Sequence, residues 1–285
     1  MSLDHAPFWS AVNEREADKL LSELAEAPKY DKVVATLFAV MQAGYGNTAM
    51  PDEVRFDLDD VRAVMGALKD RGNIDKVVKN VADVKYTYDA RKDHPASILR
   101  SGHWVWLQNG KGKYIFKRTH RPNLIDLEHE FPEETEIHHV PDGLPESISA
   151  LLGIDEQAVL ARVRNGGLIE RFLNLSGRAH ALQGHHRTTV KYGQIEIDEV
   201  YGYEPRRGEV GIVPISAKGG NDKLSWSQAL NLNVYGYEKY RHRKADIRSL
   251  GILHDATSLW IAEFSNDTSI DSIQLTRAKR YSFFH

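Results

Sequence analysis

Apolar residues recur at three- and four-residue spacing in several segments of the first 120 positions. Asp31–Gln42 carries such a stripe, and Asp57–Asp70 repeats it before Gly72, a residue type that ends helices readily. We expect a third helix to start at Asn73, whose side chain can cap it and which precedes Ile74, Val77, Val78 and Val81. The pattern therefore predicts three short helices.

A different pattern follows these helices. Trp104–Leu107 and Tyr114–Phe116 are short runs of strand-forming residues, and the turn-forming segment Asn109–Gly112 lies between them. Three helices followed by a β-hairpin is the element order of a winged helix-turn-helix. We therefore expect residues 1–120 to form a mainly helical, winged-helix-like domain.

The next segment is acidic and interrupted by proline. Its acidic residues are Asp126, Glu128, Glu130, Glu133, Glu134, Glu136, Asp142 and Glu146, and its prolines are Pro122, Pro132, Pro141 and Pro145. Proline prevents a continuous helix, and a run of like charge offers little apolar surface for packing. The pattern predicts an interdomain linker over residues 121–147, in which His138 and His139 are solvated.

Beyond the linker, two helical segments, Asp155–Arg164 and Leu168–Leu175, precede a change of period. The expected strands, rich in β-branched and aromatic residues, are Thr188–Lys191, Ile195–Tyr203, Val210–Ala217, Ile247–His254 and Leu259–Phe264. A helix is expected over Ser225–Tyr240. The predicted fold class of residues 148–285 is therefore α/β, with a mixed sheet flanked by helices.

Composition restricts the class of protein. The chain is 41% hydrophobic and 27% charged, which is typical of a globular protein, and it has no cysteine for disulfides or thiolate metal sites. We see no signal peptide, membrane span or phosphate-binding loop. The expectation is a cytoplasmic protein without a membrane or a nucleotide cofactor.

Charge is unevenly distributed on a chain of net charge −3. Residues 71–120 contain eleven Lys or Arg against four Asp or Glu, and such segregation suits DNA phosphates. The candidate DNA-binding residues are Lys76, Lys79, Lys85, Arg91, Lys111, Lys113 and, in the second half of the chain, Arg187. The alternative is an ordinary solvated basic face.

The segments Gly193–Tyr201 and Val213–Gly220 carry the candidate chemistry. Strand alternation puts Glu196 and Asp198 on one face of their strand, and Ser216 and Lys218 on one face of the next. A carboxylate and an ammonium group on adjacent strands can hold a hard cation and an attacking water together. The alternative is a simple cross-strand salt bridge.

These segments resemble the PD-(D/E)xK nuclease superfamily, to which many restriction endonucleases belong. The resemblance implies that Asp198 is the first acid of the motif and Lys218 its lysine. It further implies a restriction-type endonuclease that cleaves double-stranded DNA with Mg²⁺ (or Mn²⁺) as cofactor and acts as a homodimer.

Ser216 departs from the family pattern, which has Asp or Glu at this position. The second metal-binding acid then has to come from elsewhere: Glu170 and Glu196 are equal candidates, and Asp222 is a weaker one. Gln228 is a further candidate for a polar group facing the site. His180, His185 and His186 lack the spacing of a helical zinc pair and are better placed to face phosphate.

The departure at Ser216 leaves a second function open. The chain is then a DNA-binding regulator whose nuclease-like domain is catalytically silent. A metal-free enzyme with an unrelated α/β fold is a third possibility, for which the sequence offers no identifiable ligand pocket.

Overall fold

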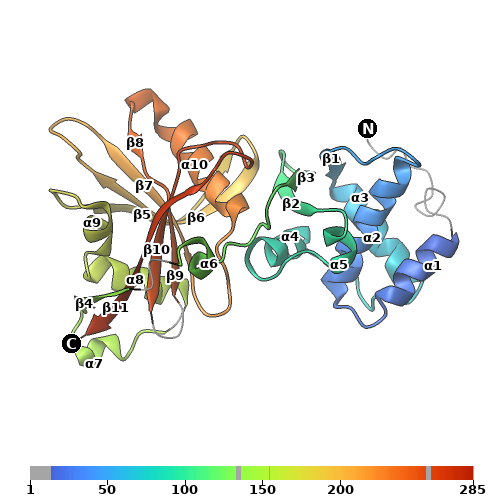
Figure 1. Ribbon diagram of the computed structural model, residues 1–285, viewed down its shortest axis with the longest axis horizontal. Helices are drawn as coiled ribbons and strands as arrows, with labels where there is room; N and C mark the ends of the chain where they lie inside the picture. The colour runs from blue at the N-terminus through green and yellow to red at the C-terminus, as the bar shows by residue number, and fades with distance from the viewer. Residues whose placement is uncertain (1–13, 133–135, 154, 255–257, 285) are drawn as a thin grey trace. The chain divides into compact units, whose positions relative to one another are not determined.

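The computed structural model describes residues 14–132, 136–153, 155–254 and 258–284. The chain divides into two compact units, Met1–Asn123 and Leu124–His285, which are described separately. In Figure 1 the first unit runs from blue to green and the second from green to red.

The first unit combines helices with a small antiparallel sheet. Its helices are α1 (Glu14–Glu23), α2 (Lys29–Gly44), α3 (Leu58–Asp70), α4 (Val81–Ala90) and α5 (Ala96–Leu99). Its strands are β1 (Glu53–Asp57), β2 (His103–Gln108) and β3 (Lys113–Thr119), in the order β1-β3-β2. The predicted helices α2 and α3 and the predicted β2–β3 hairpin are confirmed.

The helix predicted to start at Asn73 is wrong. Gly72 has a positive φ of 72°, and the Asn73 N–H bonds to the Leu68 carbonyl, so this segment completes the end of α3. The next helix, α4, begins only at Val81, where the Asn80 side chain accepts a hydrogen bond from the Ala82 N–H at 3.1 Å. Ile74 and Val78 are buried without being helical, and this burial is the origin of the misleading apolar spacing.

An aromatic cluster forms the core of the first unit. Phe38 contacts Trp104 edge-on with ring centroids 5.1 Å apart, and Phe56 stacks on Phe116 at 4.8 Å. Edge-on and stacked aromatic contacts add to the free energy gained from burying the rings. This cluster joins the helices to the three-stranded sheet.

The second unit is built on a mixed sheet of eight strands in the described residues. Their order is β4-β11-β10-β9-β7-β6-β5, with β8 beside β7. The strands are β4 (Ile137–Pro141), β5 (His180–Val190), β6 (Gly193–Tyr203), β7 (Gly211–Lys218), β8 (Asp246–Ile247), β9 (Leu250–His254), β10 (Leu259–Phe264) and β11 (Leu275–Phe284). The sheet contains parallel and antiparallel pairs, which confirms the α/β fold class.

Helices cover both faces of this sheet (Figure 1). The helices of this unit are α6 (Leu127–Glu130), α7 (Glu146–Ser149), α8 (Glu156–Asn165), α9 (Leu168–Leu173) and α10 (Trp226–Tyr240), followed by the 3-10 turn η1 (Arg241–Arg243). Every residue of β7 is buried, because α8 and α10 both pack against it. The central strand β7 thus lies in a dry environment on both sides.

The acidic segment 121–147 is not a free linker, which corrects the domain boundaries expected from the sequence. The division falls between Asn123 and Leu124. Ile137–Pro141 forms β4, which pairs in parallel with β11, and the His139 ring bonds to the Ser282 hydroxyl at 3.0 Å. The charges were misleading because none of them lies on β4 itself: Glu128 and Glu130 belong to α6 and Glu146 begins α7. Glu133 and Glu134 lie outside the described residues.

Among the described residues, no helix has both the length and the apolar character needed to span a bilayer.

Candidate active site

Strands β6 and β7 bring Asp198, Ser216 and Lys218 together, as their alternation predicts. Asp198 Oδ2 accepts a hydrogen bond from the Ser216 hydroxyl at 3.2 Å and lies 3.8 Å from Lys218 Nζ. The Lys218 side chain is 6% exposed and that of Asp198 16%. The two groups therefore form an ion pair that is longer than a hydrogen bond and largely shielded from water.

The local geometry of the two strands explains how Asp198 reaches this position. The antiparallel register of β6 and β7 ends at Glu199 and Ile215. One residue further along, the Asp198 carboxylate accepts a hydrogen bond from the Ala217 N–H at 2.7 Å, also on Oδ2. The carboxylate thus takes the place of a backbone acceptor where the two strands stop pairing, and this contact holds it in one orientation.

Electrostatics at Asp198 favour additional positive charge. Burial raises the pKa of Asp198, whereas Lys218, the Ala217 N–H and the Ser216 hydroxyl lower it, and the charge of Glu156 raises it further. The net direction is upward. The anionic form is therefore only partly compensated by its neighbours, so a cation beside it would be stabilised.

Glu156, which no motif in the sequence distinguishes, is the acid whose charge acts on Asp198. It is the first residue of α8, and Asp155 caps that helix by accepting a hydrogen bond from the Ala158 N–H at 2.9 Å. In the sequence, an acid in the first helical turn is explained by the helix dipole alone. Only the effect of its charge on Asp198 distinguishes Glu156 from other first-turn acids.

The two acids proposed from the sequence as second ligands have other partners. Glu170 accepts a hydrogen bond from the Ala179 N–H at 3.0 Å and so ties α9 to the chain entering β5. Glu196 lies 2.9 Å from His185 Nε2 and 3.3 Å from Arg187 Nε. Neither acid is among the groups that shift the pKa of Asp198.

Gln228 lies in the first turn of α10, the helix that packs against β7. Its Oε1 atom is buried and has no hydrogen-bond partner in the described part of the chain. A buried amide oxygen without a partner is costly, which is consistent with a group that a ligand or water satisfies.

The basic residues proposed for DNA contact are placed unevenly. Lys76 and Lys79 are exposed in the segment between α3 and α4, and Lys111 and Lys113 are exposed on the β2–β3 hairpin. Lys85, in contrast, forms a shielded ion pair with Asp89 within α4, so its charge is already compensated. Arg91, at the end of the same helix, has its guanidinium 5.2 Å from the Tyr86 ring centroid.

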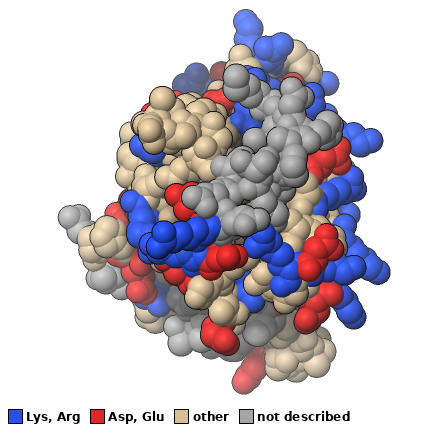
Figure 2. Space-filling model, turned by 90° about the vertical axis from the view of Figure 1, so that its right-hand side faces the viewer, with Lys and Arg blue, Asp and Glu red and all other residues tan. Residues whose placement is uncertain are grey.

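Acidic side chains are interspersed among the cations of the first unit. On the face of the molecule in Figure 2, Asp and Glu side chains lie between Lys and Arg side chains. Arg55 pairs with Glu53 at 3.2 Å and Arg62 with Asp59 at 3.2 Å. The exposed cations of this unit therefore do not form an acid-free surface.

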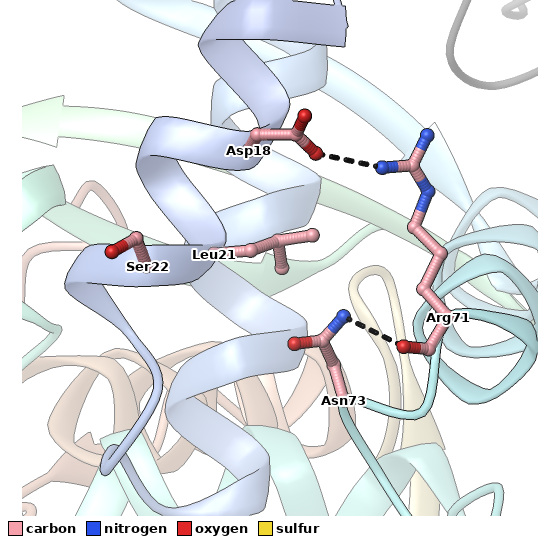
Figure 3. A pocket seen from close by; sticks show the side chains of 5 residues that line it. All are labelled: Asp18, Leu21, Ser22, Arg71 and Asn73. Atoms are coloured by element: carbon pink, nitrogen blue, oxygen red, sulfur yellow. Dashed lines mark hydrogen bonds and ion pairs between the residues drawn. The ribbon is translucent and has the colours of Figure 1, made fainter.

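A hollow of about 470 Å³ in the first unit is lined by Asp18, Leu21, Ser22, Arg71 and Asn73 (Figure 3). Arg71 reaches across it and bonds to the Asp18 carboxylate at 3.1 Å. Because this cation already has an acidic partner, the hollow shows no clear preference for an anionic ligand.

Asp198, Lys218 and Ser216 thus define the candidate site, and the charge of Glu156 acts on it. No group of three His, Asp or Glu suited to a metal ion occurs among the described residues. No family model, curated protein or solved structure matches the chain.

Proposed function

We propose that the chain is a metal-dependent endonuclease that hydrolyses phosphodiester bonds in double-stranded DNA. One observation carries the proposal: a shielded lysine, Lys218, lies 3.8 Å from a carboxylate, Asp198, whose pKa is raised by burial and by a second acid, Glu156. A perturbed carboxylate with a specific charged partner is typical of a functional site.

The order of elements around this pair supports the same proposal. Two helices precede β5, Asp198 lies on the second of three successive antiparallel strands, and Lys218 ends the third. Helix α10 follows, and the chain then returns as β9, parallel to β7. This agrees with the resemblance to the PD-(D/E)xK superfamily, which places its acid and its lysine on the second and third core strands.

Each residue has a distinct role in the proposed site. Asp198 would hold Mg²⁺ or Mn²⁺, with Glu156 as the candidate second acid, because the charge of Glu156 disfavours the Asp198 anion and a divalent cation would offset that repulsion. When bound, the cation lowers the pKa of a water molecule and offsets negative charge on the phosphate. Lys218 orients that water or stabilises charge developing at phosphorus. Ser216 and the Ala217 N–H keep the Asp198 carboxylate in position.

The first unit supports a role in DNA positioning. Its helices, followed by the β2–β3 hairpin on a three-stranded antiparallel sheet, agree with a winged-helix-like module. Lys76, Lys79, Lys111 and Lys113 are its exposed candidate contacts. Each chain has one such centre, so cleavage of both DNA strands favours a homodimer.

The test is cleavage of plasmid DNA by the full chain with Mg²⁺ or Mn²⁺. We expect Asp198→Asn, Glu156→Gln and Lys218→Met each to slow cleavage by about 10²–10³-fold, the scale for losing one preorganised charge at a reacting group. The control is Glu209→Gln, an exposed acid in the loop between β6 and β7, which should cleave like the wild type.

Two outcomes would contradict the proposal. If the wild type cleaves no plasmid DNA with either metal, the chain is not an endonuclease. If cleavage survives both Asp198→Asn and Lys218→Met, the active site is not at these two residues.

A second candidate function has its own support. Ser216 provides no carboxylate on the third strand, and no three-acid group occurs within the described residues. These observations favour a DNA-binding regulator with a silent nuclease-like unit. Such a protein would bind duplex DNA but leave the plasmid intact under every metal condition.

A further inference from the structure

Strand β5 forms an exposed edge of the sheet in the second unit. It spans His180–Val190 and occupies the end of the strand order, so only β6 pairs with it among the described residues. Residues 180–185 are all exposed, as are Arg187 and Thr189. Both faces of this strand and one row of its backbone groups are therefore accessible over most of its length.

The sequence around this edge contains no acid. Residues 171–195 include Arg171, Arg178, Arg187 and Lys191 but no Asp or Glu, although the whole chain has a net charge of −3. Three histidines, His180, His185 and His186, lie on the strand itself. The acids that contact this edge come from neighbouring elements, Glu196 of β6 and Glu238 of α10.

Two of these side chains are held in place by one acid of β6. His185 Nε2 and Arg187 Nε contact the two carboxylate oxygens of Glu196 at 2.9 and 3.3 Å, yet their side chains remain 62% and 64% exposed. A second acid, Glu238 of α10, accepts a hydrogen bond from the Lys191 N–H at 3.0 Å and fixes the end of the strand. His185 also has a φ of 47°, a left-handed conformation that is uncommon for a residue other than glycine. Backbone strain of this kind tends to occur where function constrains a side chain.

The edge lies beside the candidate active site. Glu196 and Asp198 are two residues apart on β6, a separation of about 7 Å along a strand. A polyanion that contacts Arg187 therefore passes within one or two nucleotide spacings of Asp198.

We infer that the β5 edge of the second unit binds the phosphate backbone of duplex DNA directly next to the Asp198 centre. The inference takes duplex DNA as the partner from the proposed function. Arg187 and Lys191 contact phosphates, and Glu196 orients Arg187 while partly offsetting its charge.

The charge of the side chains favours DNA over a second copy of the chain as the partner of the β5 edge. Exposed edge strands can pair with one another, but cationic side chains along an edge oppose such pairing because like charges meet. Arg187 on the strand and Lys191 directly after it match the negative charge of a nucleic-acid backbone. The occupant favoured by the charge pattern is therefore DNA.

The experiment measures binding of a fluorescein-labelled duplex to the full chain by anisotropy, in EDTA, over a range of salt concentrations. We expect the double variant Arg187→Gln/Lys191→Gln to bind more weakly. The slope of log K against log salt should decrease in magnitude by about 2, close to one unit for each phosphate that is no longer neutralised. Glu196→Gln should bind more tightly than the wild type, because a negative charge beside the phosphates is removed.

The matched control is Arg206→Gln/Lys279→Gln, which removes the same charge from the β6–β7 loop and from β11. It should keep the wild-type slope. The inference is overturned if both double variants reduce the slope equally, if neither does, if the wild type does not bind duplex at low salt, or if Arg187→Gln/Lys191→Gln changes the oligomeric state instead. Because no cleavage is measured, binding through β5 without plasmid cleavage would remove the proposed catalysis and leave this inference standing.

Discussion

Lys218 and Asp198 illustrate how single residues are adjusted by their surroundings. The ammonium group is almost fully shielded, and its partner carboxylate has two further donors, the Ser216 hydroxyl and the Ala217 N–H. Isolated charges in such an environment are expensive, so they are retained only with partners. The upward shift of the pKa of Asp198 indicates that these partners do not fully compensate for burial.

His94 in the first unit shows how burial shifts the pKa of a side chain that forms no ion pair with a described residue. Its ring stacks on Tyr88 at 4.7 Å, and burial lowers its pKa from 6.5 to about 4. The folded chain therefore keeps the ring neutral at pH values where the unfolded chain binds a proton. The free energy of unfolding should fall as pH decreases from about 6.5 towards 4.

The decrease attributable to His94 should reach at most about 3 kcal/mol, since each pKa unit corresponds to about 1.4 kcal/mol. Calorimetric unfolding of the full chain between pH 4 and 7 measures it. His94→Phe should show a weaker pH dependence than the wild type, and His120→Gln, at an exposed position, should not. Equal pH dependence of His94→Phe and the wild type would contradict the assignment.

At the scale of elements, helix boundaries depend on which polar side chain is placed to cap. Both Asn73 and Asn80 precede apolar residues, and both are reasonable N-caps in the sequence. Only Asn80 caps α4, with its Nδ2 also donating to Asp83 Oδ1 at 2.9 Å. Asn73 instead follows the end of α3, where its N–H completes the turn.

This difference predicts unequal effects of two similar substitutions. Asn80→Ala should lower the free energy of unfolding by about 1 kcal/mol, because the Ala82 N–H loses its acceptor. Asn73→Ala should have little effect, since its side chain makes one long contact, 3.5 Å, to the Arg71 carbonyl. Urea unfolding compares the two variants; a larger destabilisation by Asn73→Ala would favour a helix that starts at Asn73.

At the scale of the whole molecule, β4 attaches the acidic segment after Leu124 to the second unit. This short strand forms the edge of the large sheet beside β11, and the Arg280 side chain adds a contact to Glu128 of α6 at 3.5 Å. The residues between Leu124 and β5 therefore contribute to the second unit rather than separating two domains.

Truncation tests this division. We expect a fragment of residues 124–285 to fold cooperatively, because it retains β4 and its pairing with β11. A fragment of residues 148–285 exposes the backbone edge of β11 and should be unstable or aggregate. Circular dichroism during thermal unfolding and size-exclusion chromatography distinguish the two; a stable 148–285 fragment would show that β4 is dispensable.

The sequence by itself determined the features that depend on local periodicity. Alternation along β6 and β7 was sufficient to place Asp198 with Ser216 and Lys218, because side chains two apart on a strand share a face. The three-and-four spacing likewise located α2 and α3.

Only the tertiary structure decided the rest. Glu156 acts on Asp198 from a distant helix, while Glu170 and Glu196 are bound elsewhere. The pairing of β4 with β11 joins residues such as His139 and Ser282, 143 positions apart. Such contacts depend on how segments far apart in the chain are brought together, and neither spacing nor composition within one segment encodes that.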